Sequence, residues 1–291
     1  MTAPKAAFSD YLELTKPRLS MLSVLTTLIG YIAARPPWLP VEFISLIIGT
    51  CLAAGGVAVL NQWLEADTDA RMKRTADRPI PTGKIPTGSA FVLGVLMCAA
   101  ALGVIFVKIN GMAAIFTLLT IVSYVCWYTP AKRTSRWSTE IGAIAGAFPP
   151  LIGWAAAENG VSPLGWILFG ILVFWQIPHF MAIAWTYRHD YSNVDFPMLP
   201  VRDEKGDWVA SWSMVNAILL LMVSVLPAFL GLTTIYYGIV AGIAGLWFYW
   251  KAVVFLRPKG REGAARKLFF ASIIYLPFTL IALVADRVIF F

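Results

Sequence analysis

Residues 42–84 read EFISLIIGTCLAAGGVAVLNQWLEADTDARMKRTADRPIPTGK, an apolar run that passes directly into a charged loop. The apolar part, 42–62, is long enough to cross a bilayer as a helix, which needs about 17–25 residues. The other apolar segments of this kind lie at about 19–35, 90–108, 111–128, 140–157, 163–185, 210–230, 232–255 and 268–288. The sequence therefore predicts an all-α, polytopic membrane protein with nine transmembrane helices.

The overall composition supports this prediction. The chain has 291 residues, of which 59% are hydrophobic and 13% are charged, and its mean hydropathy is +0.73. A soluble domain carries roughly 25% charged residues. No low-complexity linker separates the apolar segments, so we expect residues 1–291 to form a single transmembrane domain.

The net charge of +7 is distributed unevenly among the loops. Loops 1–2, 3–4, 5–6 and 7–8 are short and nearly free of charge. The basic residues occupy the amino-terminal segment and the other four loops: Lys5, Lys16, Arg18, Arg71, Lys73, Arg74, Arg78, Lys84, Lys132, Arg133, Arg136, Arg188, Arg202, Lys205, Arg257, Lys259, Arg261, Arg266 and Lys267. In a nine-helix chain these all lie on one side, which the positive-inside rule places in the cytoplasm. We therefore expect a cytoplasmic amino terminus, an external carboxyl terminus and no nucleic-acid partner.

Two further features concern processing and redox chemistry. The amino-terminal segment is polar and lacks a short apolar region with a small-residue cleavage site, so we expect no cleavable signal peptide. Cys51, Cys98 and Cys126 are scattered through apolar stretches. They predict small buried side chains rather than a disulfide or a cysteine metal site.

The charged loop after segment 42–62 contains the first candidate site. Asn61, Glu65 and Asp69 are spaced i, i+4, i+8, which places them on one face of a helix. Such polar groups are costly at a membrane edge unless they have a function. Oxygen ligands of this kind suit Mg²⁺, which commonly shares its coordination with substrate phosphates.

Basic residues follow this stripe directly. Arg74 and Arg78 suit phosphate oxygens, since guanidinium groups match their geometry. Together the acids and bases indicate a magnesium-bridged diphosphate. The alternative is a solvated helix end whose charges pair among themselves. That alternative fits Asp67 and Asp77 better than Asn61, which still lies within the apolar run.

The end of segment 163–185 contains the second candidate site. His179 and Asp190 are eleven residues apart, about three helical turns, and so share a helix face. This segment opens on the same side as the loop after 42–62, and the two polar ends are expected to converge on one pocket. His179 could be functional or simply a hydrogen-bonded structural residue. For His189, which lies beyond the apolar run, a role outside the site is favoured.

The loop between segments 111–128 and 140–157 adds the pair Lys132 and Arg133, which could hold a departing diphosphate or simply set topology. The glycines at 142, 146 and 153 would allow close helix packing. Lys16 borders the same expected cavity mouth.

These residues resemble the UbiA superfamily of intramembrane prenyltransferases and, within it, the branch that farnesylates heme. The matching stretches are LTKPRLSML at 14–22, NQWLEADTDARMKRTADRPIPTG at 61–83, AFPPLIGWAA at 147–156, and WQIPHFMAIAW at 175–185 with DY at 190–191 and PMLPV at 197–201. The first motif of the superfamily usually has Asp at the position of Glu65, whereas the heme branch usually has Glu.

The resemblance implies a UbiA-type bundle with a cytoplasmic-side active site in the bacterial inner membrane. It implies transfer of farnesyl from farnesyl diphosphate to a vinyl group of heme b, giving heme O and diphosphate for the terminal oxidases. Mg²⁺ would lie on Asn61, Glu65, Asp69 and Asp190. Arg74, Arg78, Lys132 and Arg133 would hold the diphosphate. Heme A synthase and oxidase assembly factors are the protein partners that this role suggests.

Several alternatives remain open at this point. His179 would orient heme, ligate its iron or act as a base. A prenyltransferase acting on a quinone precursor or another aromatic acceptor needs the same magnesium site. A transporter would use the acids as a coupling-ion site, but its charges would lie at the bilayer midplane rather than at helix ends. A heme-binding subunit without catalysis is the third alternative.

Overall fold

The computed structural model describes residues 6–291, so Lys5 lies outside the described residues. Within this range nine helical segments are long and apolar enough to span a membrane, which confirms the predicted all-α architecture. Single helices form most of the spans: α2 (Pro17–Ala34), α3 (Pro40–Leu64), α5 (Thr87–Lys108), α10 (Pro163–Thr186), α13 (Asp207–Phe229), α14 (Ile235–Phe255) and α15 (Arg261–Phe290).

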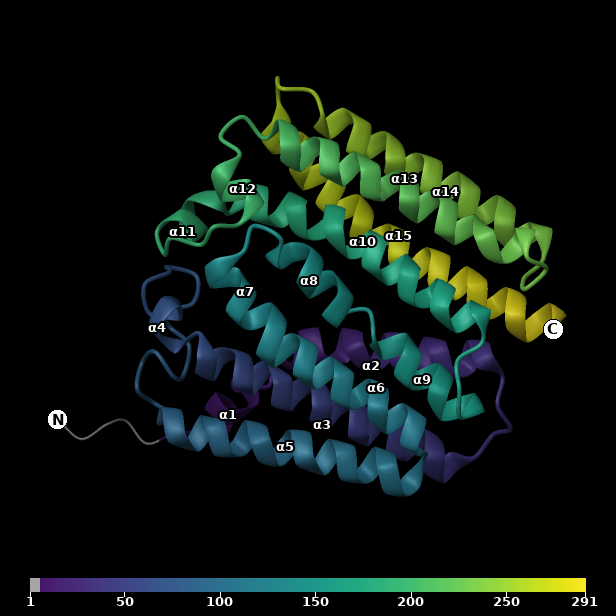
Figure 1. The fold of residues 1–291 in the computed structure, drawn as a ribbon, viewed down its shortest axis with the longest axis horizontal. Coiled ribbons are helices and arrows are strands. Elements are labelled where there is room, and N and C mark those ends of the chain that lie inside the picture. Colours follow the sequence, from purple (N-terminus) through teal and green to yellow (C-terminus); the bar gives the residue numbers. More distant parts are fainter. Residues whose placement is uncertain (1–5) are drawn as a thin grey trace.

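The two remaining spans are interrupted. Gly111–Thr134 consists of α6 (Gly111–Val122), the π-helical segment η1 (Ser123–Tyr128) and α7 (Thr129–Thr134). Ser138–Glu158 consists of α8 (Ser138–Ala145) and α9 (Pro149–Glu158). The short helices lie toward the end of the bundle opposite the C-terminus (Figure 1): α1 (Phe8–Leu14), α4 (Ala66–Asp69), α11 (Arg188–Ser192) and α12 (Leu199–Arg202).

Local sequence explains where several of the helices begin. Pro17, Pro40, Pro149 and Pro163 each open a helix, a position where the missing proline N–H costs nothing. Helix α15 begins at Arg261, earlier than the predicted start at 268, because the left-handed Gly260 caps it there. Arg266 and Lys267 were predicted as loop residues, but both lie in the first turns of this helix.

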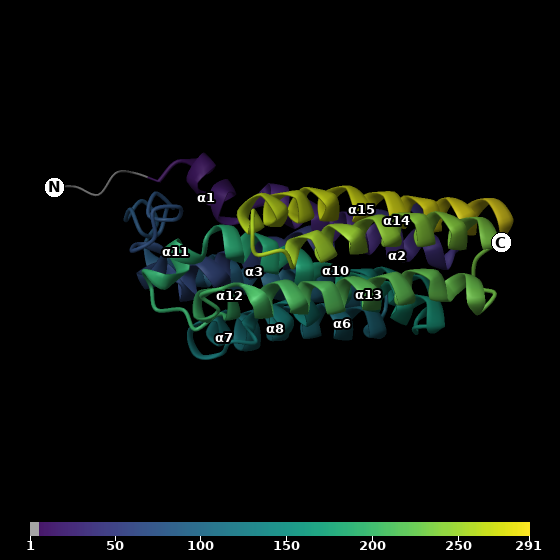
Figure 2. The same ribbon diagram turned by 90° about the horizontal axis from the view of Figure 1, so that it is seen from above.

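The helices run roughly parallel to one another in both views (Figures 1 and 2). Helices α10, α13, α14 and α15 pack in succession around one hydrophobic core, and α2, α3, α5, α6 and α9 surround a second. The outer surface is apolar: Leu96, Ile243 and Ile281 are more than half exposed. Such a surface suits lipid rather than water.

Two of the three cysteines differ from their predicted environment. Cys98 is buried as expected, but Cys51 and Cys126 are exposed, and all three thiols are free. A thiol behaves as a small apolar group, so the lipid-facing side of a span accepts it as readily as the core does.

Glycines permit the closest helix contacts, as the sequence predicted. A Cβ on Gly153 would lie 1.8 Å from the backbone oxygen of Thr27 on α2. A Cβ on Gly146 would lie 2.2 Å from Oε1 of Gln176 on α10. The α2–α9 crossing therefore depends on the absence of a side chain at Gly153.

Gly153→Ala is expected to destabilise the protein by about 1–3 kcal/mol, because backbone atoms must move to admit the methyl group. The matched control is Gly103→Ala on α5, where a Cβ meets nothing within 4 Å. Thermal unfolding in detergent measures both variants. Equal midpoints for the two variants would contradict the packing argument.

Candidate active site

The polar segments predicted to converge do lie around one cavity. Its volume is about 310 Å³, and its walls come from the end of α3 with α4, from η1 and α7, and from α10 and the segment after it. Asn61, Glu65, Asp69, Lys132 and His179 all line it. Three of the elements that contribute lining residues, α4, α7 and α11, lie at the end of the bundle opposite the C-terminus (Figure 1).

The acidic stripe lies on one wall of this cavity. Helix α3 ends at Leu64 and α4 begins at Ala66, yet backbone bonds bridge the junction: Glu65 N donates to Asn61 O, and Asp69 N donates to Glu65 O. The i, i+4 spacing is therefore preserved across the break. Asn61, Glu65 and Asp69 are 2%, 6% and 0% exposed, which contradicts the alternative of a solvated helix end.

Each oxygen ligand has a basic partner. Lys132 Nζ lies 2.8 Å from Glu65 Oε1, and Arg78 Nη1 lies 2.5 Å from Asp69 Oδ2. Lys16 Nζ donates to Asn61 Oδ1 at 3.1 Å. Pairing of this kind is required, because an uncompensated buried carboxylate is strongly destabilising.

The donor set fits Mg²⁺ shared with a phosphate ligand. Asp69 Oδ1 is buried and has no hydrogen-bond partner among the described residues, so one carboxylate oxygen is left for a ligand. Within residues 6–291, no group of three or more His, Cys, Asp or Glu side chains is arranged so that these side chains alone could hold a metal ion. Two carboxylates and an amide provide only part of a magnesium shell, which normally keeps waters or substrate oxygens.

Arg133 and Asp190 were predicted for this site, but neither lines the cavity. Arg133 pairs instead with Asp67 at 2.5 Å, and this contact lowers the pKa of the Asp67 carboxyl. Consecutive helical residues point about 100° apart, so Lys132 and Arg133 cannot both face inward. Asp190 is displaced because α10 ends at Thr186 and the non-helical backbone of Tyr187 separates it from α11, which breaks the assumed helical register.

Arg74 lies at the cavity as predicted, and two tyrosines hold it. Its guanidinium lies 5.6 Å and 5.8 Å from the ring centroids of Tyr187 and Tyr191, and it donates to the Tyr191 hydroxyl at 3.3 Å. Arg74 makes no ion pair within the described residues. Its charge is therefore available to an anionic ligand.

A serine on the last helix positions His179. The Ser272 hydroxyl lies 2.6 Å from His179 Nδ1 and 2.5 Å from the Phe269 backbone oxygen. When the hydroxyl donates to Phe269, Nδ1 carries the ring proton and Nε2 has the free lone pair. The imidazole also stacks on Trp175, with 4.7 Å between centroids. His189 is exposed and lies outside the cavity.

The sequence placed Lys16 at the expected cavity mouth without a role in the site and did not indicate Tyr124 or Tyr128, although all three line the cavity. Burial, together with the charges of Arg78 and Lys132, lowers the pKa of Lys16 to about 7. Tyr124 and Tyr128 lie on η1, a π-helical turn that changes the face each residue presents. The LTKPR stretch could have indicated Lys16. No feature of the sequence indicates the π-helical turn that carries Tyr124 and Tyr128.

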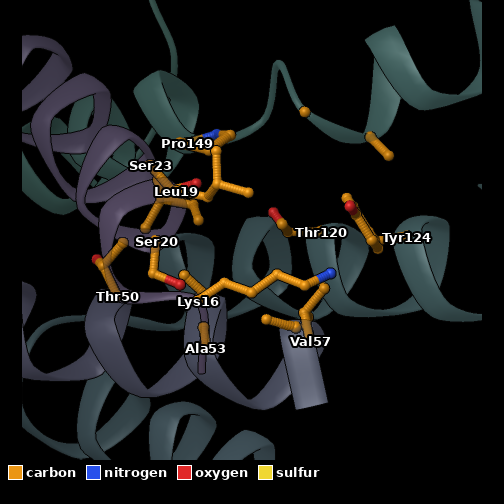
Figure 3. A pocket seen from close by; sticks show the side chains of 15 residues that line it. Lys16, Leu19, Ser20, Ser23, Thr50, Ala53, Val57, Thr120, Tyr124 and Pro149 are labelled. Atoms are coloured by element: carbon orange, nitrogen blue, oxygen red, sulfur yellow. The ribbon is translucent and has the colours of Figure 1, made fainter. Parts of the chain in front are cut away.

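An apolar pocket adjoins this cavity between α2, α3, α6 and α9 (Figure 3). Lys16, Leu19 and Tyr124 line both spaces, so the two lie side by side. The Lys16 side chain extends across the pocket toward Thr120 and Tyr124 in Figure 3. Beyond it the walls are small or apolar residues such as Ala53 and Val57. A charged cavity joined to an apolar pocket suits an amphiphilic ligand.

Among solved structures, the chain resembles one described as concerning digeranylgeranylglyceryl phosphate synthase, with a TM-score of 0.81, 18% identity and coverage of 96% of this chain and 98% of that one. It also resembles a UbiA homologue from Archaeoglobus fulgidus bound to DMAPP and Mg²⁺, with a TM-score of 0.72, 12% identity and coverage of 94% and 99%. Identities this low show a shared fold.

Sequence comparison extends this result. The chain is 67% identical over 285 residues to a protoheme IX farnesyltransferase from Opitutus terrae, covering 98% of this chain and 97% of the relative. It is 40% identical over 288 residues to one from Solibacter usitatus, covering 96% and 98%. The family model described as the UbiA prenyltransferase family matches residues 23–274. The chain therefore belongs to the UbiA prenyltransferase family.

Proposed function

We propose that this protein transfers a farnesyl group from farnesyl diphosphate to a vinyl group of heme b, giving heme O and diphosphate. The main support is the composition of the cavity. Asn61, Glu65 and Asp69 line it together with His179 and with the basic side chains Lys16, Arg74, Arg78 and Lys132. The protoheme IX farnesyltransferase relatives support heme as the acceptor.

The diphosphate binds at the charged end of the cavity. Asn61, Glu65 and Asp69 hold Mg²⁺, which when bound supplies the positive charge that stabilises the departing diphosphate. Lys16, Arg74, Arg78 and Lys132 provide further positive charge around the same oxygens. Lys132 and Arg78, which neutralise the carboxylates in the described structure, then pair with the phosphate oxygens instead.

The farnesyl chain extends into the apolar pocket beyond Lys16. This arrangement puts the allylic carbon at the junction of the two spaces, near Tyr124. Tyrosine ring faces stabilise positive charge, and the apolar walls delay quenching by water.

The bond changes follow from this placement. The C1–O bond of farnesyl diphosphate breaks, and diphosphate leaves with the electron pair. C1 bonds to the terminal carbon of the vinyl group, and the positive charge passes to the inner vinyl carbon, where water adds. His179 Nε2 takes the proton that the water releases, since its lone pair is free.

The chain acts as one domain in the bacterial inner membrane. Residues from Lys16 to Met198 line the cavity, while α15 contributes Ser272 and Phe269, which position His179. The basic loops support a cytoplasmic cavity mouth and amino terminus, with the carboxyl terminus outside, by the positive-inside rule.

The acceptor is tested by offering purified protein heme b and an aromatic acid, such as 4-hydroxybenzoate, in the same reaction with farnesyl diphosphate and Mg²⁺. Mass spectrometry of the products is expected to show heme O and no prenylated acid. Prenylation of the acid alone would instead establish a UbiA-type enzyme with a quinone-precursor acceptor.

Glu65→Gln and Asp69→Asn are each expected to lower kcat about a hundredfold or more, because both remove a metal-facing charge. Chelation of Mg²⁺ with EDTA should abolish the activity of the wild type. The matched control is Asp67→Asn, since Asp67 lies on the same short helix as Asp69 but pairs with Arg133 away from the cavity. Comparable losses in all three variants would contradict the magnesium assignment.

His179→Ala is expected to lower kcat about 10²–10⁴-fold, the range for loss of a general base, with partial recovery on addition of imidazole. Its affinity for farnesyl diphosphate should remain that of the wild type. His189→Ala, which removes the only other histidine, serves as the control and should keep full activity. An active His179→Ala enzyme would exclude the base role.

A further inference from the structure

A second, larger space lies beside the active-site cavity and has no role in the mechanism above. It is a groove of about 730 Å³ between the turn before α8 and the segment from α12 to the start of α13. Its walls include Arg136, Trp137, Leu199, Arg202, Lys205 and Trp208. Ligand sites for small molecules typically measure about 300–1,000 Å³.

Aromatic surfaces form one part of the groove. Trp208 is 75% exposed and Trp137 is 44% exposed, so both present open ring surface. Trp137 is held edge-to-face against Trp212, with 6.0 Å between centroids, and Trp212 Nε1 donates to Glu140 Oε1 at 2.7 Å. Trp137 is therefore held in place, and the two exposed rings suit a flat aromatic ligand.

Unshared positive charge forms the other part. Arg136, Arg202 and Lys205 are exposed, and none makes an ion pair within the described residues. The nearby acids are already used: Asp203 accepts from the backbone N–H groups of Gly206 and Val209, and Asp207 pairs with Arg261. Only Glu204 among the lining acids lacks a partner, so the groove favours an anion.

The groove lies next to the active-site cavity. On one side, Trp137 lines the groove and Thr139 lines the cavity. On the other, Leu199 lines the groove and its neighbour Met198 lines the cavity. Residues one or two positions apart in the chain therefore line the two spaces, so this wall of the groove adjoins the cavity.

We propose that this groove binds the acceptor porphyrin, an inference that rests on the proposed function. Heme is flat and carries two propionates at one edge, which match the cations Arg136, Arg202 and Lys205. Its macrocycle lies against Trp137 and Trp208, and its vinyl edge faces the wall toward the cavity. The active-site cavity, at about 310 Å³, already receives the diphosphate, so most of the macrocycle needs a separate space.

The proposal is tested by heme binding without turnover. Ferric heme is titrated into the full-length protein in nanodiscs of neutral lipid, without farnesyl diphosphate or Mg²⁺, and tryptophan quenching gives Kd. The triple variant R136Q/R202Q/K205Q is expected to raise Kd about tenfold or more, since three exposed charge contacts are lost. All three side chains are exposed, so the substitutions spare the core.

Lys259→Gln is the matched control, because Lys259 is an exposed basic residue outside the groove; its Kd should equal that of the wild type. Heme dimethyl ester, which lacks the propionate charges, supplies a second comparison. The wild type should bind the ester about tenfold more weakly than heme, whereas the triple variant should bind both about equally.

Wild-type Kd in the triple variant would overturn the proposal. It would also be overturned by an effect that appears only in nanodiscs with anionic lipid, which would identify a lipid-headgroup site. In steady-state assays the triple variant should have a higher KM for heme than the wild type and the same KM for farnesyl diphosphate. If the triple variant makes heme O with an unchanged KM for heme, the groove proposal is refuted and the proposed function stands. If heme binding depends on the groove but no heme O is produced, the proposed function is refuted and the groove proposal stands.

Discussion

Two carboxylates buried at the edge of a membrane domain require positive partners, and this requirement organises the site. Glu65 pairs with Lys132, and Asp69 pairs with Arg78. An unpaired buried charge would cost several kcal/mol, so each pair ties the end of α3 and α4 to another segment of the chain. In the proposed reaction the carboxylates would hold Mg²⁺ and the same cations would pair with diphosphate, so the added positive and negative charges offset each other.

The other features serve this charged centre. The apolar pocket begins where Lys16 and Tyr124 line both spaces, so a prenyl chain leaves the charged region at once. His179 sits on another wall, held by Ser272 from the last helix. The close α2–α9 crossing at Gly153 positions the helix that carries the pocket wall. The boundary between the charged cavity and the apolar pocket therefore coincides with the boundary between the diphosphate and the prenyl chain of the substrate.

Hydropathy and charge were enough to predict the nine spans, since each is a long apolar run bounded by polar residues. The i, i+4, i+8 spacing likewise predicted the wall formed by Asn61, Glu65 and Asp69, because helical hydrogen bonding persists through the break at Glu65. The same periodicity failed for Asp190, since α10 ends at Thr186. It also could not separate Lys132 from Arg133, or reveal Tyr124 and Tyr128 on a π-helical turn that composition does not signal.

The most direct test of this account is a structure of the full-length protein with Mg²⁺ and a non-hydrolysable farnesyl diphosphate analogue. The account predicts metal density on Asn61, Glu65 and Asp69, with Lys132 and Arg78 turned from the carboxylates to the phosphate oxygens and the prenyl chain in the pocket beyond Lys16. Metal bound elsewhere, with both ion pairs intact, would contradict it.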